Sequence, residues 1–275
     1  MSIRNLVVIS DTHIGCKLAL LPPTGAQLDE GGCYLPSDLQ LTLWQYWREF
    51  WDKFVPSATE GEPYTVVMNG DCIDGVHHGS TSQWSHNMKD QRRVAIEVLS
   101  PIVAGAESYY HIRGTAAHVG QSAEDEEAVA EALGAIPNED GQYSRYDLWI
   151  RVNKCLGHIL HHVGATGSQA YEATAVYKEF IEEQIEAARW DTTAPDFIVR
   201  SHRHRHIMTI APTGRGPGYS VVTPCWQGKT DFVWKIPGGR LSLPQWGGVV
   251  IRRAKGEQLQ VLPFVKTPQR SKVEG

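Results

Sequence analysis

Short, mostly apolar runs alternate with longer amphipathic segments through the first half of the chain. The runs have the length and continuity of buried β-strands. Between them, apolar positions recur at the intervals of three and four residues that are typical of helices. This order predicts parallel strands joined by right-handed helical crossovers. The predicted strands span 6–9, 64–68 and 109–112, and the predicted helices span 38–54 and 88–103.

The pattern changes in the second half, where two neighbouring strands precede one long amphipathic helix. From residue 206 onward we expect only strands and turns. The predicted strands span 146–152, 156–162, 197–199, 206–211, 219–223, 249–253 and 258–265, and the helix spans 171–190. Two further segments are expected to lie at the surface. Residues 16–36 are expected to form a long loop, and a short acidic helix over 124–133 is expected to turn its charges to solvent.

Composition narrows the class of protein. The chain has 275 residues, of which 41% are hydrophobic, and its net charge is −5. These values are ordinary for a globular chain and exclude a disordered or collagen-like one. We detect no repeat and no linker, so we expect a single domain over 1–275, in which 251–275 forms the last strand and a basic tail with a frayed end.

Cysteine usage and the N-terminus indicate a compartment. The five cysteines form no CxxC pair, which disfavours a disulfide framework or a zinc knuckle. No apolar stretch approaches a membrane span, and the first residues do not resemble a signal peptide. We therefore expect a soluble cytoplasmic protein with no membrane partner.

Aspartate and histidine side chains gather where the predicted strands end. In an open α/β sheet the carboxyl ends of the strands form one edge, and ligands bind there. Mixed carboxylate and imidazole ligands suit Mn, Fe or Zn. The clusters are Asp11-Thr-His13, Asp71-Cys-Ile-Asp74, Gly114-Thr-Ala-Ala-His118, His161-His162 and the run 201–206, Ser-His-Arg-His-Arg-His.

The spacing within these clusters suggests how an ion would be held. On an extended segment, Asp11 and His13 would point the same way and grip one ion together, and His202 and His204 repeat that spacing. A single carboxylate such as Asp71 has two oxygens and is able to bridge two ions. Two bridged ions about 3.5–4 Å apart activate a shared water and orient a phosphate.

The five clusters together resemble the motifs of the calcineurin-like metallophosphoesterases. That family has the blocks DxH, GDxxD, GNH(D/E), a histidine that closes a strand, and GHxH, and the clusters of this chain follow the same order over 11–204. The resemblance implies an α/β fold, a four-layer αββα sandwich of two mixed β-sheets flanked by helices. It also implies a dinuclear metal centre, for which manganese is favoured over iron, zinc, nickel or magnesium.

The resemblance assigns roles to individual residues. Asp11, His13, Asp71 and His204 would hold the first ion. Asp71 would share the second ion with His202 and His161, with His162 as the alternative to His161. Asp74 would orient a ligand such as His13.

One block departs from the family pattern. The family's GNH is replaced by the residues from Gly114 to His118, so the asparagine ligand is missing. Either Thr115 or water would supply the missing oxygen. His118 would act as general acid and Arg113 would lie near the phosphate, as the two catalytic residues. Ser201 replaces the first glycine of GHxH.

Other residues near these motifs carry two interpretations each. Arg203 and Arg205 either bind the substrate phosphate or face solvent as plain surface charges. His77, His78 and His86 lie in a Gly/Ser-rich loop that either overhangs the site or plays no part in it. Trp84 either stacks on a base or sugar or anchors this loop to the body.

These features predict a metal-dependent phosphoric ester hydrolase. A metal-bridging hydroxide would attack phosphorus in line, the ions and Arg113 would neutralise charge, and His118 would protonate the leaving alkoxide. The substrate is a phosphate ester, either a small molecule such as a nucleotide or, for a nuclease, DNA or RNA. The rival hypothesis is a catalytically silent scaffold of the same fold. The sequence predicts no oligomeric state.

Overall fold

Two β-sheets pack face to face in the computed structural model, which describes residues 3–77, 79–120, 122–164, 168–236 and 239–269. The first sheet has the strand order β13-β12-β1-β4-β5-β6. The strands from β1 to β6 run parallel, while β12 and β13 are antiparallel to their neighbours. The bounds are β1 (Asn5–Ile9), β4 (Thr65–Asn69), β5 (Ser108–Ile112), β6 (Ser144–Arg145), β12 (Trp246–Arg252) and β13 (Gln260–Lys266).

The second sheet is also mixed and has the order β10-β11-β9-β8-β7. Its central pairs, β11 with β9 and β9 with β8, are parallel, and its outer pairs are antiparallel. The bounds are β7 (Asp147–Val152), β8 (Cys155–Leu160), β9 (Phe197–Arg200), β10 (Ile207–Thr213) and β11 (Gly216–Val222). A small separate hairpin joins β2 (Ala26–Gln27) to β3 (Cys33–Tyr34) inside the segment expected to be a plain loop.

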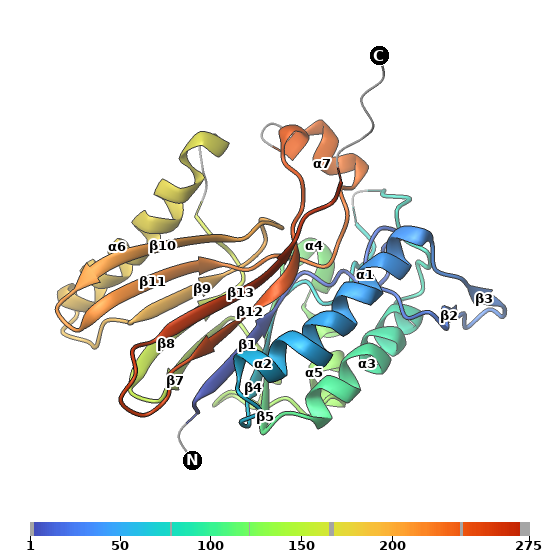
Figure 1. The fold of residues 1–275 in the computed structure, drawn as a ribbon. Coiled ribbons are helices and arrows are strands. Elements are labelled where there is room, and N and C mark those ends of the chain that lie inside the picture. Colours follow the sequence, from blue (N-terminus) through green and yellow to red (C-terminus); the bar gives the residue numbers. More distant parts are fainter. Residues whose placement is uncertain (1–2, 78, 121, 165–167, 237–238, 270–275) are drawn as a thin grey trace.

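Helices cover the outer faces of both sheets (Figure 1). On the first sheet lie α1 (Asp38–Glu49), α3 (Met88–Ala104) and α5 (Glu124–Ala132), and on the second lies α6 (Glu172–Arg189). The helix α1 continues through a π-helical turn, η1 (Phe50–Phe54), into α2 (Val55–Ala58). The shorter elements are α4 (Ala116–Val119), η2 (Gln169–Tyr171), α7 (Asp231–Lys235) and η3 (Gly239–Leu241).

The alternation of side chains along β1 explains the layers. Leu6 and Val8 lie in the apolar core between the two sheets, whereas Val7 and Ile9 lie in the core beneath the helices. Successive side chains of a strand point to opposite faces, so a strand with a core on each side is apolar throughout. The four-layer αββα sandwich of two mixed sheets is confirmed.

One sequence expectation needs correction and another needs a limit. The region after residue 206 is not all strand and turn, because α7 and η3 interrupt it. The basic tail forms β13 as expected, but its end at 270–275 lies outside the described residues. Within the described ranges, no helix is long and apolar enough to cross a membrane.

Candidate metal centre

The candidate ligands sit on backbone turns at the ends of the strands. Asp11, His13 and Asp71 have φ angles of 52°, 42° and 51°, and His202 and His204 have φ angles of 70° and 56°. These values lie in the left-handed region, which residues other than glycine rarely adopt. The prediction that Asp11 and His13, and His202 and His204, converge by alternation on extended segments is therefore wrong. The tight turn brings Asp11 and His13 into one cluster instead, whereas His202 and His204 lie in two different clusters.

Two glycines make room for these turns. A Cβ atom at Gly70 would lie 2.4 Å from His161 Nδ1, and one at Gly114 would lie 2.0 Å from Asp71 Oδ1. Gly70 also has a φ of +81°, which glycine adopts at no steric cost. The backbone therefore approaches the site more closely than any larger residue would permit.

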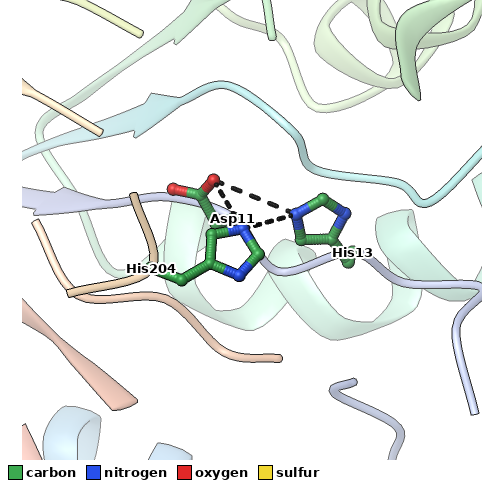
Figure 2. A group of neighbouring side chains, drawn as sticks. All are labelled: Asp11, His13 and His204. Atoms are coloured by element: carbon green, nitrogen blue, oxygen red, sulfur yellow. Dashed lines mark hydrogen bonds and ion pairs between the residues drawn. The ribbon is translucent and has the colours of Figure 1, made fainter. Parts of the chain in front are cut away.

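Asp11, His13 and His204 form one cluster, here called the inner group. Figure 2 shows the two imidazole rings turned toward the carboxylate of Asp11. The Nε2 atoms of His13 and His204 lie 3.1 Å apart, and Asp11 Oδ1 is 3.2 Å from His204 Nε2 and 3.9 Å from His13 Nε2. Asp11 and His13 are buried, and the His204 side chain is 19% exposed.

Asp71, His161 and His202 form a second cluster, the outer group. Asp71 Oδ2 lies 3.1 Å from His161 Nε2 and 3.9 Å from His202 Nδ1. Asp71 and His161 are buried, whereas the His202 side chain is 46% exposed. The outer group thus opens to solvent on its His202 side.

Asp71 connects the two groups through one oxygen. Its Oδ2 atom lies 3.9 Å from His13 Nε2 of the inner group, in addition to its outer-group neighbours. Its other oxygen, Oδ1, accepts hydrogen bonds from the backbone N–H of Thr115 at 2.7 Å and from the Thr115 hydroxyl at 3.1 Å. The Thr115 hydroxyl also lies 3.3 Å from Oδ2, which is the oxygen placed between the groups.

The two groups fit divalent ions. Ligand atoms about 2.1 Å from one ion are about 3.0–3.4 Å apart at octahedral or tetrahedral angles. Three of the separations in the two groups, 3.1, 3.1 and 3.2 Å, match that spacing, and the Asp11–His13 and Asp71–His202 separations are longer, at 3.9 Å. Among the described residues, the buried Asp11 Oδ1 has no hydrogen-bond partner, as expected of an oxygen that serves an ion.

The cysteine next to Asp71 in the chain does not compete for such an ion. Cys72 follows Asp71 in the chain and is buried, and burial together with the charge of Glu126 raises the pKa of its thiol well above the usual range. A neutral thiol is a poor ligand. The donor set is therefore carboxylate and imidazole, which suits Mn, Fe or Zn.

Opposite charges perturb the titration of both groups. Burial raises the pKa of Asp11, but contact with His204 and the charge of His161 outweigh it and bring the pKa to about 2. For His161, burial lowers the pKa, but the charge and hydrogen bond of Asp71 raise it to about 10. The same kinds of contact hold the pKa of Asp71 well below its usual range, despite burial. In the absence of an ion, protons on these imidazoles balance the carboxylates.

Hydrogen bonds set which nitrogen of His161 faces the site. Its Nδ1–H donates to the backbone carbonyl oxygen of Asn69 at 2.6 Å, which leaves Nε2 to face Asp71. Such a bond is the usual orientation device of a metal-binding histidine. His162 is exposed and its ring lies edge-on to that of His161 at 5.2 Å. Of the two histidines, His161 is the one whose contacts suit a ligand.

Asp74 lies behind the inner group. Its Oδ1 atom is 3.3 Å from His13 Nδ1, so the carboxylate faces the ring nitrogen opposite the one that faces Asp11. Gln83 and Gln227 donate to Asp74 at 2.6 and 3.3 Å. Burial raises the pKa of Asp74, but the contacts with His13 and His77 lower it well below the usual range. An ionised Asp74 is placed to orient His13.

His118 packs against the candidate ligand His13. Its Nδ1–H donates to the backbone carbonyl oxygen of Asp74 at 2.6 Å, and its ring lies edge-on to His13 at 4.5 Å. Burial and the neighbouring His13 lower the pKa of His118 to about 4. With Nδ1 engaged, Nε2 is the nitrogen that remains for proton transfer, and it is an acceptor in the neutral ring.

The arginines predicted near substrate form contacts with other residues of the protein. Arg113 donates to the backbone oxygen and hydroxyl of Ser144, lies 3.7 Å from Glu127 and covers the ring of Tyr146. These contacts hold the guanidinium beside β6 and support this strand, and a position of Arg113 near the phosphate stays a prediction.

Arg203 and Arg205 also make contacts within the protein. Arg205 pairs with Glu172 at the start of α6, and Arg203 donates to the backbone oxygen of Gly164. Both arginines are partly buried. They tie the 201–206 turn to α6 and to the segment before it, so they are not a plain solvent-facing pair, and their binding of substrate stays a prediction.

The loop after Asp74 places one of its histidines beside the site. His77 Nε2 lies 3.6 Å from Asp74 Oδ2, and its ring lies 4.6 Å from that of His118. Trp84 is buried and stacks on Tyr34 at 5.9 Å, so it anchors the loop. His86 is exposed, and His78 lies outside the described residues.

Sequence reasoning missed Glu126, which holds the two loops that carry Asp71 and Thr115. The side chain is fully buried, and its two oxygens accept hydrogen bonds from the backbone N–H groups of Cys72 at 2.8 Å and Gly114 at 2.7 Å. The expectation that the acidic helix turns its charges to solvent is wrong for this residue. The signal was present, because 126, 129, 130 and 133 share one helical face and the last three are Val, Ala and Leu.

Comparisons with known proteins add a description of the fold only. No family model matches the chain, and no curated protein matches it. Among solved structures, Vps29 of Chaetomium thermophilum matches with 10% identity over 97% of this chain and 98% of that one, at a TM-score of 0.43. A metallophosphoesterase from Sphaerobacter thermophilus matches with 10% identity over 94% and 88%, at a TM-score of 0.39. The sulfate thiohydrolase SoxB of Thermus thermophilus matches with 14% identity over 96% and 57%, at a TM-score of 0.42. Similarity of this degree assigns neither an activity nor a family.

Proposed function

We propose that this chain is a metal-dependent phosphoesterase with a dinuclear centre. The observation that carries the proposal is the position of Asp71 Oδ2, which faces His161 and His202 of the outer group and His13 of the inner group. One carboxylate oxygen between two sets of ligands is the arrangement that two adjacent ions require.

The residues divide the work of holding two ions. Asp11, His13 and His204 would hold the first, His161 and His202 the second, and Asp71 both. Two ions in such a site lower the pKa of a shared water and polarise a phosphate. We place Mn²⁺ first, with Fe, Zn, Ni and Mg as ions to be compared with it. Thr115 positions Asp71 through its N–H and hydroxyl, and Asp74 positions His13.

His118 is the proposed proton donor to the leaving group. Its Nδ1 bond to the Asp74 carbonyl aims the ring and leaves Nε2 for the transfer. The low pKa of the free ring, about 4, means that the ring is neutral before substrate binds. The negative charge of a bound phosphate ester raises the pKa of a neighbouring imidazole, so protonation and substrate binding are coupled.

An open cavity beside His118 offers space for the organic part of an ester. Its volume is about 340 Å³, and its lining includes His77, Ala116, Ala117 and Met88.

The rival hypothesis of a silent scaffold leaves the burial and mutual orientation of the ligands without a purpose.

The test is hydrolysis of bis(p-nitrophenyl) phosphate by the purified chain with and without Mn²⁺. We expect activity that EDTA abolishes and Mn²⁺ restores. Asp71→Asn should lower the activity by more than about 100-fold, since outer partners of metal ligands alone account for 10–100-fold. Asp52→Asn, which changes an exposed carboxylate paired with Arg48 on α1 and η1, is the matched control and should stay active.

Activity that persists in EDTA and in the Asp71→Asn variant would rule out the mechanism. Purified protein that carries no stoichiometric metal and shows no hydrolysis in any of the five ions would favour the scaffold.

A further inference from the structure

An excursion of the chain, described over 228–236 and 239–244, rises from the edge of the metal centre. The residues at its two ends are bonded to the site. Gln227 donates to Asp74 Oδ1 at 3.3 Å, and the backbone N–H of Gln245 donates to the carbonyl oxygen of His204 at 2.8 Å. Figure 1 shows α7, which belongs to this excursion, projecting from the body of the molecule. The excursion is therefore anchored at both of its ends to residues of the site.

The excursion carries large apolar side chains in solvent. Phe232 is 60% exposed, Trp234 is 56% exposed and Leu241 is 79% exposed. Exposed apolar side chains that gather at one place on a soluble chain mark an interaction surface.

Basic side chains are interleaved with these apolar ones. Lys229 Nζ lies 3.4 Å from the centre of the Trp234 ring, and Lys235 and Arg240 are exposed. Over 229–241 there are three basic residues and one acidic residue, a net charge of +2 in a chain whose net charge is −5. We call Lys229, Phe232, Trp234, Lys235, Arg240 and Leu241 the aromatic–basic surface.

We propose that the aromatic–basic surface binds single-stranded nucleic acid and presents it to the metal centre. Aromatic rings stack on bases of any sequence, and basic side chains neutralise the phosphates between them. A polynucleotide is also a chain of phosphodiesters, which is the bond that the neighbouring site is proposed to cleave. The inference thus rests on the proposed function and names its substrate class.

The net charge of the whole chain agrees with a confined binding surface. A chain with a net charge of −5 repels a polyanion over much of its surface, so attachment requires a local basic patch. An apolar protein partner or a neutral membrane would gain little from the cations between the rings.

Binding of a fluorescein-labelled 20-nucleotide oligo(dT) to the full chain, followed by anisotropy, tests the proposal. The titration is done in EDTA to prevent cleavage and repeated in Mn²⁺, with the oligonucleotide checked on a gel. We expect Trp234→Ala to weaken binding by about 5- to 100-fold, the range for loss of one stacked base. Trp190→Ala is the matched control, because Trp190 is 70% exposed at the end of α6, and it should change the affinity less than about twofold.

Charge reversal tests the phosphate contacts separately. Lys235→Glu should weaken binding and lower the slope of log affinity against log salt by about 0.7, the value for one phosphate contact on a single strand. Lys178→Glu on α6, whose side chain is 72% exposed, should leave the slope unchanged. Circular dichroism confirms that each variant is folded.

The outcomes separate this inference from the proposed function. If the chain hydrolyses bis(p-nitrophenyl) phosphate but does not bind oligo(dT), or binds it equally well with Trp234→Ala, the inference fails and the proposed function stands. If it binds oligo(dT) through Trp234 but hydrolyses neither compound, the proposed function fails. If phosphatidylserine vesicles bind through Trp234 and oligo(dT) does not, the surface is a membrane contact and the inference is overturned.

Discussion

The inner and outer groups use the same kinds of ligand in different surroundings. In the inner group, Asp11 and His13 are buried and His204 is nearly so, and Asp74 supports His13 from behind. In the outer group, Asp71 and His161 are equally buried, but nearly half of the His202 side chain is exposed. A ligand in contact with water is easily replaced by water, so we expect the inner ion to be retained and the outer ion to exchange.

The comparison is tested most strongly by removing one histidine from each group. His204→Ala should lower hydrolysis by more than about 100-fold, and excess Mn²⁺ should not restore it, because the position left unfilled is less exposed to water than that of His202. His202→Ala should also lose activity at low Mn²⁺ but regain it at high Mn²⁺, since water reaches the vacated position.

Metal content after dialysis, measured by elemental analysis, checks this difference directly. We expect two ions per chain in the unaltered protein and one in His202→Ala. His86→Ala, which removes an exposed histidine, should keep both ions. Equal metal loss from both ligand variants would contradict the distinction between the groups.

A second test sharpens the role of Asp74, which supports the inner group alone. Asp74→Asn removes the charge that faces His13 Nδ1 and should weaken binding of the tighter ion by about 10- to 100-fold, as is usual for the hydrogen-bond partner of a ligand. Competition with a metal indicator gives the affinity of each ion. Asp29→Asn, on the surface near α3, is the control, and a weakening of both ions alike would show that Asp74 acts on the whole centre.

The outer group should show a characteristic dependence on pH. The pKa of His161 is raised to about 10, so its imidazole carries a proton at neutral pH in the absence of an ion, and binding of an ion must release that proton. The affinity should therefore rise about tenfold per pH unit between pH 6 and 8.5 for each proton released. Calorimetry in buffers of different ionisation enthalpy counts the protons.

The same shift fixes the sign of the effect on stability. Because the folded pKa of His161 lies above its unfolded value of about 6.5, the ion pair with Asp71 stabilises the metal-free fold fully below that value and is lost only as the pH rises through about 10. An affinity that does not change with pH would show that His161 is not a ligand.

The smallest effect on activity is expected from Glu126, which supports the loops and contacts no ligand side chain of either group by hydrogen bond. Glu126→Gln leaves one backbone N–H of Cys72 or Gly114 facing an amide NH₂ group and should lower the free energy of unfolding by about 1–3 kcal/mol. Urea unfolding of the metal-free protein measures it. Glu124→Gln, at an exposed position of the same helix, should change stability by less than about 0.5 kcal/mol.

Much of the fold and the membership of the site follow from the sequence, because both depend on local patterns. Buried apolar runs predict the strands, and the polar residues that end them must lie at one edge of the sheet. The structure confirms the predicted architecture. The single-domain organisation stays a prediction, supported by a candidate centre whose residues run from Asp11 to His204.

The rest depends on backbone conformation and on distant partners, which a local pattern does not encode. The i, i+2 spacing of Asp11 and His13 is compatible with a strand or with a tight turn, and the fold uses the turn. Arg113 and Arg205 are bonded to Ser144 and Glu172, which only the tertiary fold brings near them.

The left-handed turns at the candidate ligands have a consequence for the energetics of the whole chain. A residue other than glycine held in that region costs on the order of 1–3 kcal/mol, and five candidate ligands are so held. Their sum is comparable with the net stability of a typical domain, about 5–15 kcal/mol. The favourable interactions in the sandwich around the centre must therefore exceed this cost and still leave a stable fold. In fragments that contain all the ligands but lack the two sheets, these residues would leave the left-handed conformation, and the affinity for ions would fall. The expected affinity for metal therefore depends on the entire tertiary structure, which holds a few ligand residues in this backbone conformation.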